Sequence, residues 1–139
     1  SDEIEIDEIN IRNATYNSMH RALKNILDDC KQYLILVDGN DFKPYTKYDN
    51  KLGLIQIPHT CITGGDNKYT SIAAASILAK VARDEYIEKL CSDNPELEIR
   101  YNILKNKGYG TKIHLDGINT YGITKYHRKT FGICQNYNI

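Results

Sequence analysis

The 139-residue chain lacks the features of several specialised classes of protein. It has no run approaching the ~20 apolar residues that a membrane span requires, and no basic-then-apolar signal segment at its start. Its formal net charge is zero, which argues against holding nucleic acid by bulk charge alone, although a local basic face stays possible. It has no tryptophan, and no function follows from that. We expect an intracellular, cytoplasmic protein that does not contact a membrane.

Cysteine is present, but not in the spacing of a zinc site. The four cysteines lie far apart and none forms a C-x-x-C pair: Cys30, Cys61, Cys91 and Cys134. Separated thiols in a cytosolic chain are most simply unpaired. At 41% hydrophobic and 26% charged residues the chain can build one core. We therefore expect a single domain over residues 1–139.

Apolar periodicity and turn residues divide the chain into helices and strands. In chain order we predict a long amphipathic helix from Ser1 to about Asp28, a strand over 33–37, a surface loop over 41–51, a short strand over 54–57 stopped by Pro58, a turn over 64–67, a helix from Ser71 to about Leu90, a break at 94–95, a loop over 108–111 and a short helix over 113–121. The continuous apolar run at 33–37 is typical of a strand buried on both faces. This order of elements indicates an α/β domain.

Two aspartates stand at the ends of predicted elements. Asp38 ends the buried strand, where α/β proteins tend to place ligand sites, and Asp66 follows two glycines and precedes a helix. Taken alone, Asp38 is more typical of a turn than of a functional site, and Asp66, a weaker candidate, is typical of a turn or a helix cap. Together, acids at the ends of neighbouring elements could share metal ions, and their hard oxygen ligands suit Mg²⁺ or Mn²⁺.

Other polar groups stand on the main predicted helix and after it. Lys80 and Asp84 have i, i+4 spacing, so a surface ion pair competes with a functional role. In the loop over 108–111, glycines on both sides of Tyr109 would let it approach a ligand, and a packed tyrosine in a tight turn is the alternative. The basic triplet over 127–129 could touch phosphates, but its composition favours a solvated surface turn.

Six segments, in the same order as in the family, resemble motifs of the ribonuclease HII family. They are EIDEINIRNAT at 5–15, LVDGN at 36–40, GGD at 64–66, SIAAASILAKVARDEYI at 71–87, KGYGTKIHL at 107–115 and YGITKYHRKTF at 121–131. The matches cover nearly the whole chain and are far more specific together than any one of them alone.

The resemblance implies an α/β, ribonuclease H-like fold in which helices flank a mixed sheet. It implies a metal-dependent endoribonuclease that hydrolyses the phosphodiester 5′ of ribonucleotides, in RNA–DNA hybrids or embedded in duplex DNA, by two-metal-ion catalysis with Mg²⁺ or Mn²⁺. Two of the family's four acids match here, as Asp38 and Asp66. Tyr109 would pack against the ribose, whose 2′-hydroxyl distinguishes RNA from DNA. The predicted substrate contacts are Tyr109, Gly108, Gly110, Thr111, Ser71 and Lys80.

The chain departs from the family pattern in three ways. Gly64 replaces a lysine, and the loop over 40–66 is longer than in typical bacterial members. The chain also has no D-E-A-G-R-G string, which in the family holds the other two acids. Three explanations stay open: another chain supplies that segment, the native protein is longer, or catalysis has been lost and nucleic-acid binding kept. We favour a fragment of a larger enzyme, incomplete at its N-terminus.

Overall fold

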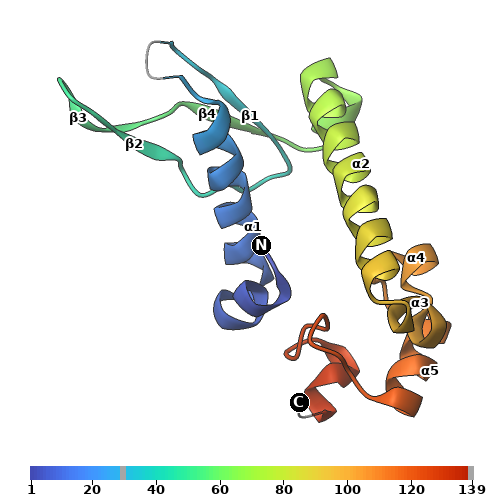
Figure 1. Cartoon of the computed structure of the whole chain (residues 1–139). Coiled ribbons are helices and arrows are strands. Elements are labelled where there is room, and N and C mark those ends of the chain that lie inside the picture. Colours follow the sequence, from blue (N-terminus) through green and yellow to red (C-terminus); the bar gives the residue numbers. More distant parts are fainter. Residues whose placement is uncertain (29–30, 138–139) are drawn as a thin grey trace. The chain divides into compact units, whose positions relative to one another are not determined.

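The computed structural model describes residues 1–28 and 31–137 (Figure 1). The chain divides into two compact units. The first contains Ser1 and Ile9–Ile77, and the second contains Asp2–Glu8 and Leu78–Ile139. Each unit has a hydrophobic core of its own.

The chain combines helices with short strands, which confirms the predicted α/β class: over the described residues one helix comes first, four strands follow it, and the other helices follow the strands. The helices are α1 (Glu3–Ile26), α2 (Thr70–Asp93), α3 (Glu96–Tyr101), α4 (Ile103–Asn106) and α5 (Lys112–Tyr121), with the 3-10 turns η1 (Gly65–Asn67) and η2 (Gly132–Asn136). The strands are β1 (Ile35–Asp38), β2 (Thr46–Asp49), β3 (Gly53–Gln56) and β4 (His59–Ile62). None of the helices within the described ranges is long and apolar enough to cross a membrane.

Helix α1 starts where the sequence predicts, but it is not continuous. The carboxylate of Asp2 accepts a hydrogen bond from the Glu5 N–H at 2.9 Å, as expected of an N-terminal cap. Asn10 then leaves helical geometry, with φ 66° and ψ 161°. Its side-chain oxygen accepts from the Asn13 N–H at 3.1 Å, so Asn10 caps the second half of α1. The prediction of one unbroken helix is wrong, because periodicity does not reveal a cap inside a helical pattern.

Strands β1 and β4 pair in parallel and end together, with Asp38 opposite Ile62. The prediction of a strand buried on both faces is wrong for this chain. Ile35 and Val37 are buried, whereas Leu36 is only half-buried and Leu34 before the strand is 61% exposed. Side chains alternate between the faces of a strand. The buried side packs with residues of α1, which are Tyr16, Met19 and Leu23.

Strands β2 and β3 form an antiparallel hairpin that extends beyond β1 and β4 in Figure 1. The predicted surface loop over 41–51 therefore contains β2, and that prediction is wrong over Thr46–Asp49. The carboxylate of Asp49 builds the turn by accepting from the N–H groups of Lys51 at 2.8 Å and Leu52 at 2.9 Å. Strand β4, directly after Pro58, was also not expected.

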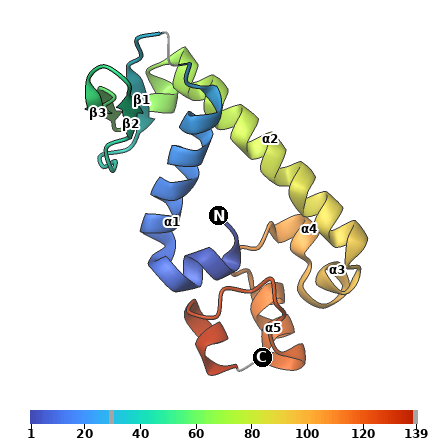
Figure 2. The same ribbon diagram turned by 60° about the vertical axis from the view of Figure 1, so that its left-hand side comes forward.

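The second unit is built around a buried tyrosine. Tyr101 is fully buried and Leu97 is 1% exposed, and they share a core with residues from the end of α2 and from α5. Figure 2 shows α3, α4 and α5 gathered beside the C-terminal end of α2. Gly117 allows α5 to approach α3 closely, because a Cβ there would lie 2.2 Å from the Arg100 carbonyl oxygen.

Three of the cysteines are free thiols, as their separation predicts. Cys91 and Cys134 are buried, and burial raises the pKa of both thiols. A buried thiol with a raised pKa behaves as a small apolar side chain. Cys30 lies outside the described residues.

Candidate active site and the Tyr109 loop

The carboxylate of Asp38 marks the C-terminal end of β1 and is held by the chain that follows β4. Its Oδ1 accepts a hydrogen bond from the Gly65 N–H at 2.8 Å. Asp66 is the next residue along and lies half-buried in η1. The parallel register of β1 and β4 ends both strands at one edge, which brings the two predicted acids into neighbouring positions of the first unit.

Gly64 and Gly65 allow the backbone after β4 to pass close to the Asp38 carboxylate. Gly65 is buried, and a Cβ on it would lie 2.7 Å from Cδ1 of Ile72 and 3.4 Å from Oδ1 of Asp38. A side chain at this position would press on both α2 and the carboxylate. Gly64 adopts the left-handed region at φ 65°, which glycine enters without strain. The replacement of the family's lysine by Gly64 is therefore compatible with the local backbone.

The chemistry of the donor set suits a hard divalent cation. Both candidate ligands are carboxylates, and Asp38 is exposed while Asp66 is half-buried. Within residues 1–28 and 31–137, no group of three or more His, Cys, Asp or Glu side chains could hold a metal ion. Mg²⁺ is commonly bound by one or two carboxylates together with water and substrate phosphates. The two aspartates fit such an ion, but they supply only part of its ligands.

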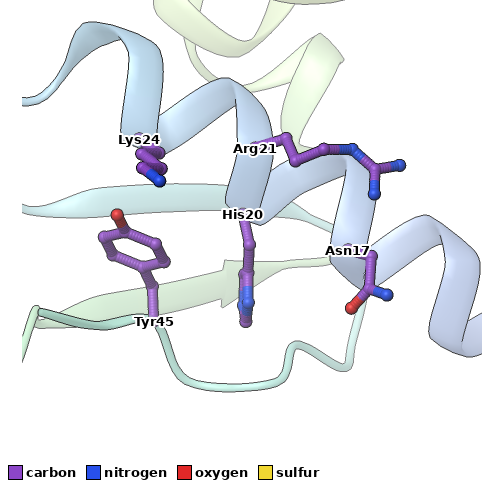
Figure 3. Close-up of a pocket in the computed structure, with 5 residues that line it drawn as sticks. All are labelled: Asn17, His20, Arg21, Lys24 and Tyr45. Atoms are coloured by element: carbon purple, nitrogen blue, oxygen red, sulfur yellow. The ribbon is translucent and has the colours of Figure 1, made fainter.

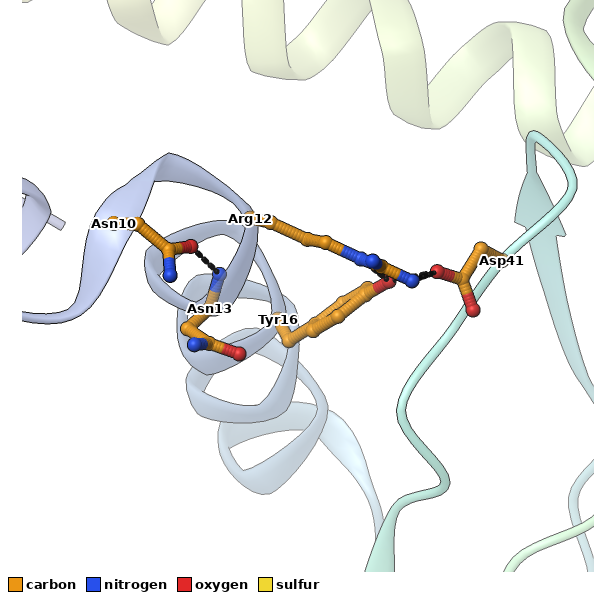
Figure 4. A network of polar contacts seen from close by, with 5 residues as sticks. All are labelled: Asn10, Arg12, Asn13, Tyr16 and Asp41. Carbon is orange, nitrogen blue, oxygen red and sulfur yellow. Dashed lines mark hydrogen bonds and ion pairs between the residues drawn. The ribbon is translucent and has the colours of Figure 1, made fainter.

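The segment after Asp38 is tied to α1 by a polar network (Figure 4). The carboxylate of Asp41 accepts hydrogen bonds from the Arg12 guanidinium and the Tyr16 hydroxyl. These hydrogen bonds, from Tyr16 first and Arg12 second, hold the pKa of Asp41 below its usual value. All of these groups are solvent-accessible, so the network orients the segment more than it stabilises the fold.

An open pocket on the first unit is lined by basic side chains. Figure 3 shows its lining residues, Asn17, His20, Arg21 and Lys24 of α1 together with Tyr45, and Lys24 and His20 lie nearest to Tyr45. His20 has a structural role, since its Nε2 lies 2.7 Å from the Lys43 carbonyl oxygen and its ring contacts Tyr45 edge-on. No chemistry beyond a local positive charge follows from this pocket.

The loop of residues 107–111 between α4 and α5, which we call the Tyr109 loop, presents a tyrosine to solvent. The Tyr109 side chain is 72% exposed, so the alternative of a packed tyrosine is wrong. Asn106 is buried and fixes the backbone of the loop by two hydrogen bonds, both at 2.9 Å. Its side-chain Oδ1 accepts from the Gly108 N–H, and its backbone carbonyl accepts from the Tyr109 N–H. Arg83 of α2 donates to the Lys107 carbonyl at 2.8 Å.

Two buried histidines lie behind the same loop. His114 Nδ1 lies 2.9 Å from the Tyr109 carbonyl oxygen, and His114 Nε2 lies 3.1 Å from His127 Nε2. His114 and His127 are 6% and 8% exposed. The solvated turn predicted over 127–129 is therefore wrong for His127, because packing on Tyr101 was invisible in the local composition. Lys129, in contrast, is exposed.

The remaining predicted contacts stand on α2 and at the start of α5. Ser71, in the first unit, and Lys80, in the second, are both exposed. Thr111 is the N-cap of α5, and its side chain accepts from the His114 N–H. Asp84 lies 3.7 Å from Nζ of Lys107. Sequence reasoning gave no role to Asn106, whose side chain organises the Tyr109 loop and whose type carries no motif signal.

The small sheets flanked by helices are consistent with a ribonuclease H-like fold, and comparison with known proteins gives the family. A family model described as Ribonuclease HII matches residues 1–134. Ribonuclease HII of Christiangramia forsetii is 55% identical over 127 residues, which cover 91% of this chain and 57% of that protein. Ribonuclease HII of Parabacteroides distasonis is 48% identical over 91% of this chain and 56% of its own length.

The chain therefore belongs to the ribonuclease HII family. It spans little more than half the length of the curated relatives it matches. The expected resemblance is confirmed. The roles of individual site residues stay predictions.

Proposed function

We propose that this chain is part of a type 2 ribonuclease H that hydrolyses the phosphodiester 5′ of a ribonucleotide, in RNA–DNA hybrids or within duplex DNA. The observation that carries the proposal is the Asp38 carboxylate, held at the end of β1 by the Gly65 amide directly before Asp66. Membership of the ribonuclease HII family supports the class of reaction.

Asp38 and Asp66 would hold Mg²⁺ or Mn²⁺, because carboxylate oxygens are the ligands these ions prefer. A bound divalent ion stabilises the negative charge that develops on a phosphate during hydrolysis. The contribution of the chain is orientation, since the Gly65 N–H sets the direction of the Asp38 carboxylate. Two carboxylates are fewer ligands than a hard cation takes, so we expect the 139-residue chain to bind Mg²⁺ weakly.

Tyr109 would contact the ribose of the substrate. Its exposed ring stands on a loop whose backbone is held by Asn106, Arg83 and His114. A tyrosine hydroxyl is both a donor and an acceptor, which suits an approach to a 2′-hydroxyl. Gly108 and Gly110 leave the ring accessible from both sides of the chain.

The proposal is tested by fusing the chain to the part of the Christiangramia forsetii relative that it does not cover. With Mg²⁺ or Mn²⁺, the fusion should cleave a DNA duplex that contains one ribonucleotide, on the 5′ side of that ribonucleotide. Asp38→Asn should reduce cleavage below detection. The matched control is Asp116→Asn, which removes the same charge from an exposed position of α5.

Binding of the duplex without cleavage, in a fusion that is folded, would contradict the nuclease proposal. That outcome would favour a nucleic-acid-binding module without catalysis. Equal loss of cleavage in Asp38→Asn and Asp116→Asn would contradict the assignment of Asp38, because the effect would then follow from charge and not from position.

A further inference from the structure

We infer that His127 and His114 are positioning residues, which hold the Tyr109 loop in one conformation through a relay of oriented hydrogen bonds. The functional consequence of the relay rests on the proposed contact between Tyr109 and ribose. The relay itself involves only residues of the second unit. It can therefore be tested separately from the nuclease activity.

The direction of the relay is set at its inner end by a backbone amide. The Thr124 N–H donates to Nδ1 of His127 at 3.0 Å. A backbone N–H can only donate, so Nδ1 of His127 carries no proton. A neutral imidazole then carries its proton on Nε2. His127 is thus the Nε2–H tautomer.

The same reasoning assigns the tautomer of His114. Nε2 of His127 lies 3.1 Å from Nε2 of His114, so His127 donates and His114 accepts. The proton of His114 must then be on Nδ1, which lies 2.9 Å from the Tyr109 carbonyl oxygen. A carbonyl can only accept, so the Tyr109 carbonyl requires the same His114 tautomer that follows from the Thr124 N–H. Each imidazole has one tautomer that satisfies all of its partners.

Burial keeps the two rings in this arrangement. The ring of Tyr101 contacts both imidazoles edge-on, with centroids 6.0 Å from His114 and 4.9 Å from His127. Tyr101 is fully buried, and its hydroxyl donates to the Gly122 carbonyl at 3.0 Å. A group whose rotamer is fixed by packing can hold another in place. The core of the second unit therefore sets the position of an exposed loop.

The Tyr109 loop needs such support because glycines flank the tyrosine. Gly108 has φ 85°, and glycine backbone loses more conformational freedom on ordering than any other residue. The Tyr109 carbonyl accepts from His114 Nδ1 and from the Thr111 N–H at 2.8 Å. Fixing the loop before substrate arrives removes an entropy cost from binding.

Two substitutions of His127 separate the relay from packing. His127→Phe keeps an aromatic ring but removes the donor to His114. His127→Gln places an amide nitrogen close to the position of Nε2, so it can still donate to His114, although it packs less well on Tyr101. The relay predicts that Gln preserves the Tyr109 loop and Phe does not. Packing alone predicts the opposite order.

Nuclear magnetic resonance of the 139-residue chain tests both steps. Long-range ¹H–¹⁵N spectra of the unsubstituted chain at neutral pH should show unprotonated nitrogens at His127 Nδ1 and His114 Nε2. Amide order parameters of residues 108–111 should be ~0.85 in the unsubstituted chain and in His127→Gln, and below ~0.6 in His127→Phe. A proton on Nε2 of His114, or an ordered loop in His127→Phe, would overturn the inference. The tautomer measurement needs no variant, so a misfolded substitution does not prevent the test.

The functional consequence is measured in the fusion protein described above. His127→Phe should reduce the preference for cleaving a duplex with a ribonucleotide over an all-DNA duplex by the same factor as Tyr109→Ala. His127→Gln should keep this preference. If Tyr109→Ala leaves this preference unchanged, the proposed ribose contact is wrong, while the resonance data still decide the relay. If Tyr109→Ala lowers the preference and His127→Phe does not, positioning through His127 is wrong.

Discussion

Acidification should destabilise the second unit through His127. Burial, and secondly the charge repulsion from the neighbouring His114, lower the pKa of His127 from 6.5 to about 4. The groups that face the ring are His114, Tyr101 and Thr124, and none of them carries a negative charge that would favour the imidazolium. The folded chain therefore holds His127 in its neutral form.

The sign and size of the effect follow from this lowered pKa. Between pH 6.5 and about 4 the unfolded chain binds more protons at His127 than the folded chain does. The contribution of His127 is complete above pH 6.5 and is lost as the pH falls through this range. A pKa of 6.5 in the unfolded chain and about 4 in the folded chain corresponds to roughly 2–3 kcal/mol of unfolding free energy lost between pH 7.5 and pH 4.5.

The perturbation that isolates this contribution is His127→Gln, which removes the titrating group. Urea unfolding of both proteins at pH 7.5 and pH 4.5, followed by circular dichroism, gives the change in each. The unsubstituted chain should lose roughly 2–3 kcal/mol more unfolding free energy than the variant on acidification. The pKa of His127 can also be read directly from the pH dependence of its ring proton signals. A pKa near 6.5, or equal losses in the two proteins, would refute the reasoning.

Three further substitutions test other parts of the structure. Gly117→Ala should lower the free energy of unfolding by roughly 1–3 kcal/mol in urea denaturation, because the added Cβ would lie 2.2 Å from the Arg100 carbonyl oxygen. Asp7→Ala should lower the free energy of unfolding by roughly 1–3 kcal/mol, since Asp7 accepts hydrogen bonds from the backbone N–H and the hydroxyl of Thr130. An unchanged midpoint of urea unfolding would show that these hydrogen bonds do not contribute. Tyr109→Ala and Tyr109→Phe should each change the free energy of unfolding by less than ~0.5 kcal/mol, because the side chain is exposed. In the fusion, Tyr109→Phe should keep much of the cleavage and Tyr109→Ala should lose most of it. A large fall in melting temperature for Tyr109→Ala would argue against an exposed recognition residue.

Much of the fold and the candidate site follows from local sequence signals. The apolar run before Asp38 predicts a strand that ends at an acid, and β1 does end at Asp38. The helix predicted from Ser1 does begin at Glu3, where the Asp2 carboxylate accepts a hydrogen bond from the Glu5 N–H. The glycines around Tyr109 predict a loop, and of the two readings left open there the structure shows the exposed tyrosine. Each of these features depends on residues within a few positions of one another.

The sequence by itself thus determined the family, the α/β class and the position of the acid at which β1 ends, because motifs, apolar periods and turn residues are local. Tertiary structure alone decided that His127 is buried, since its partners His114 and Tyr101 are distant in sequence. It also decided that the Asp38 carboxylate points to the Gly65 amide, 27 residues further along the chain. Burial and the direction of a hydrogen bond depend on which distant residues the fold brings into contact, and no local pattern contains that information.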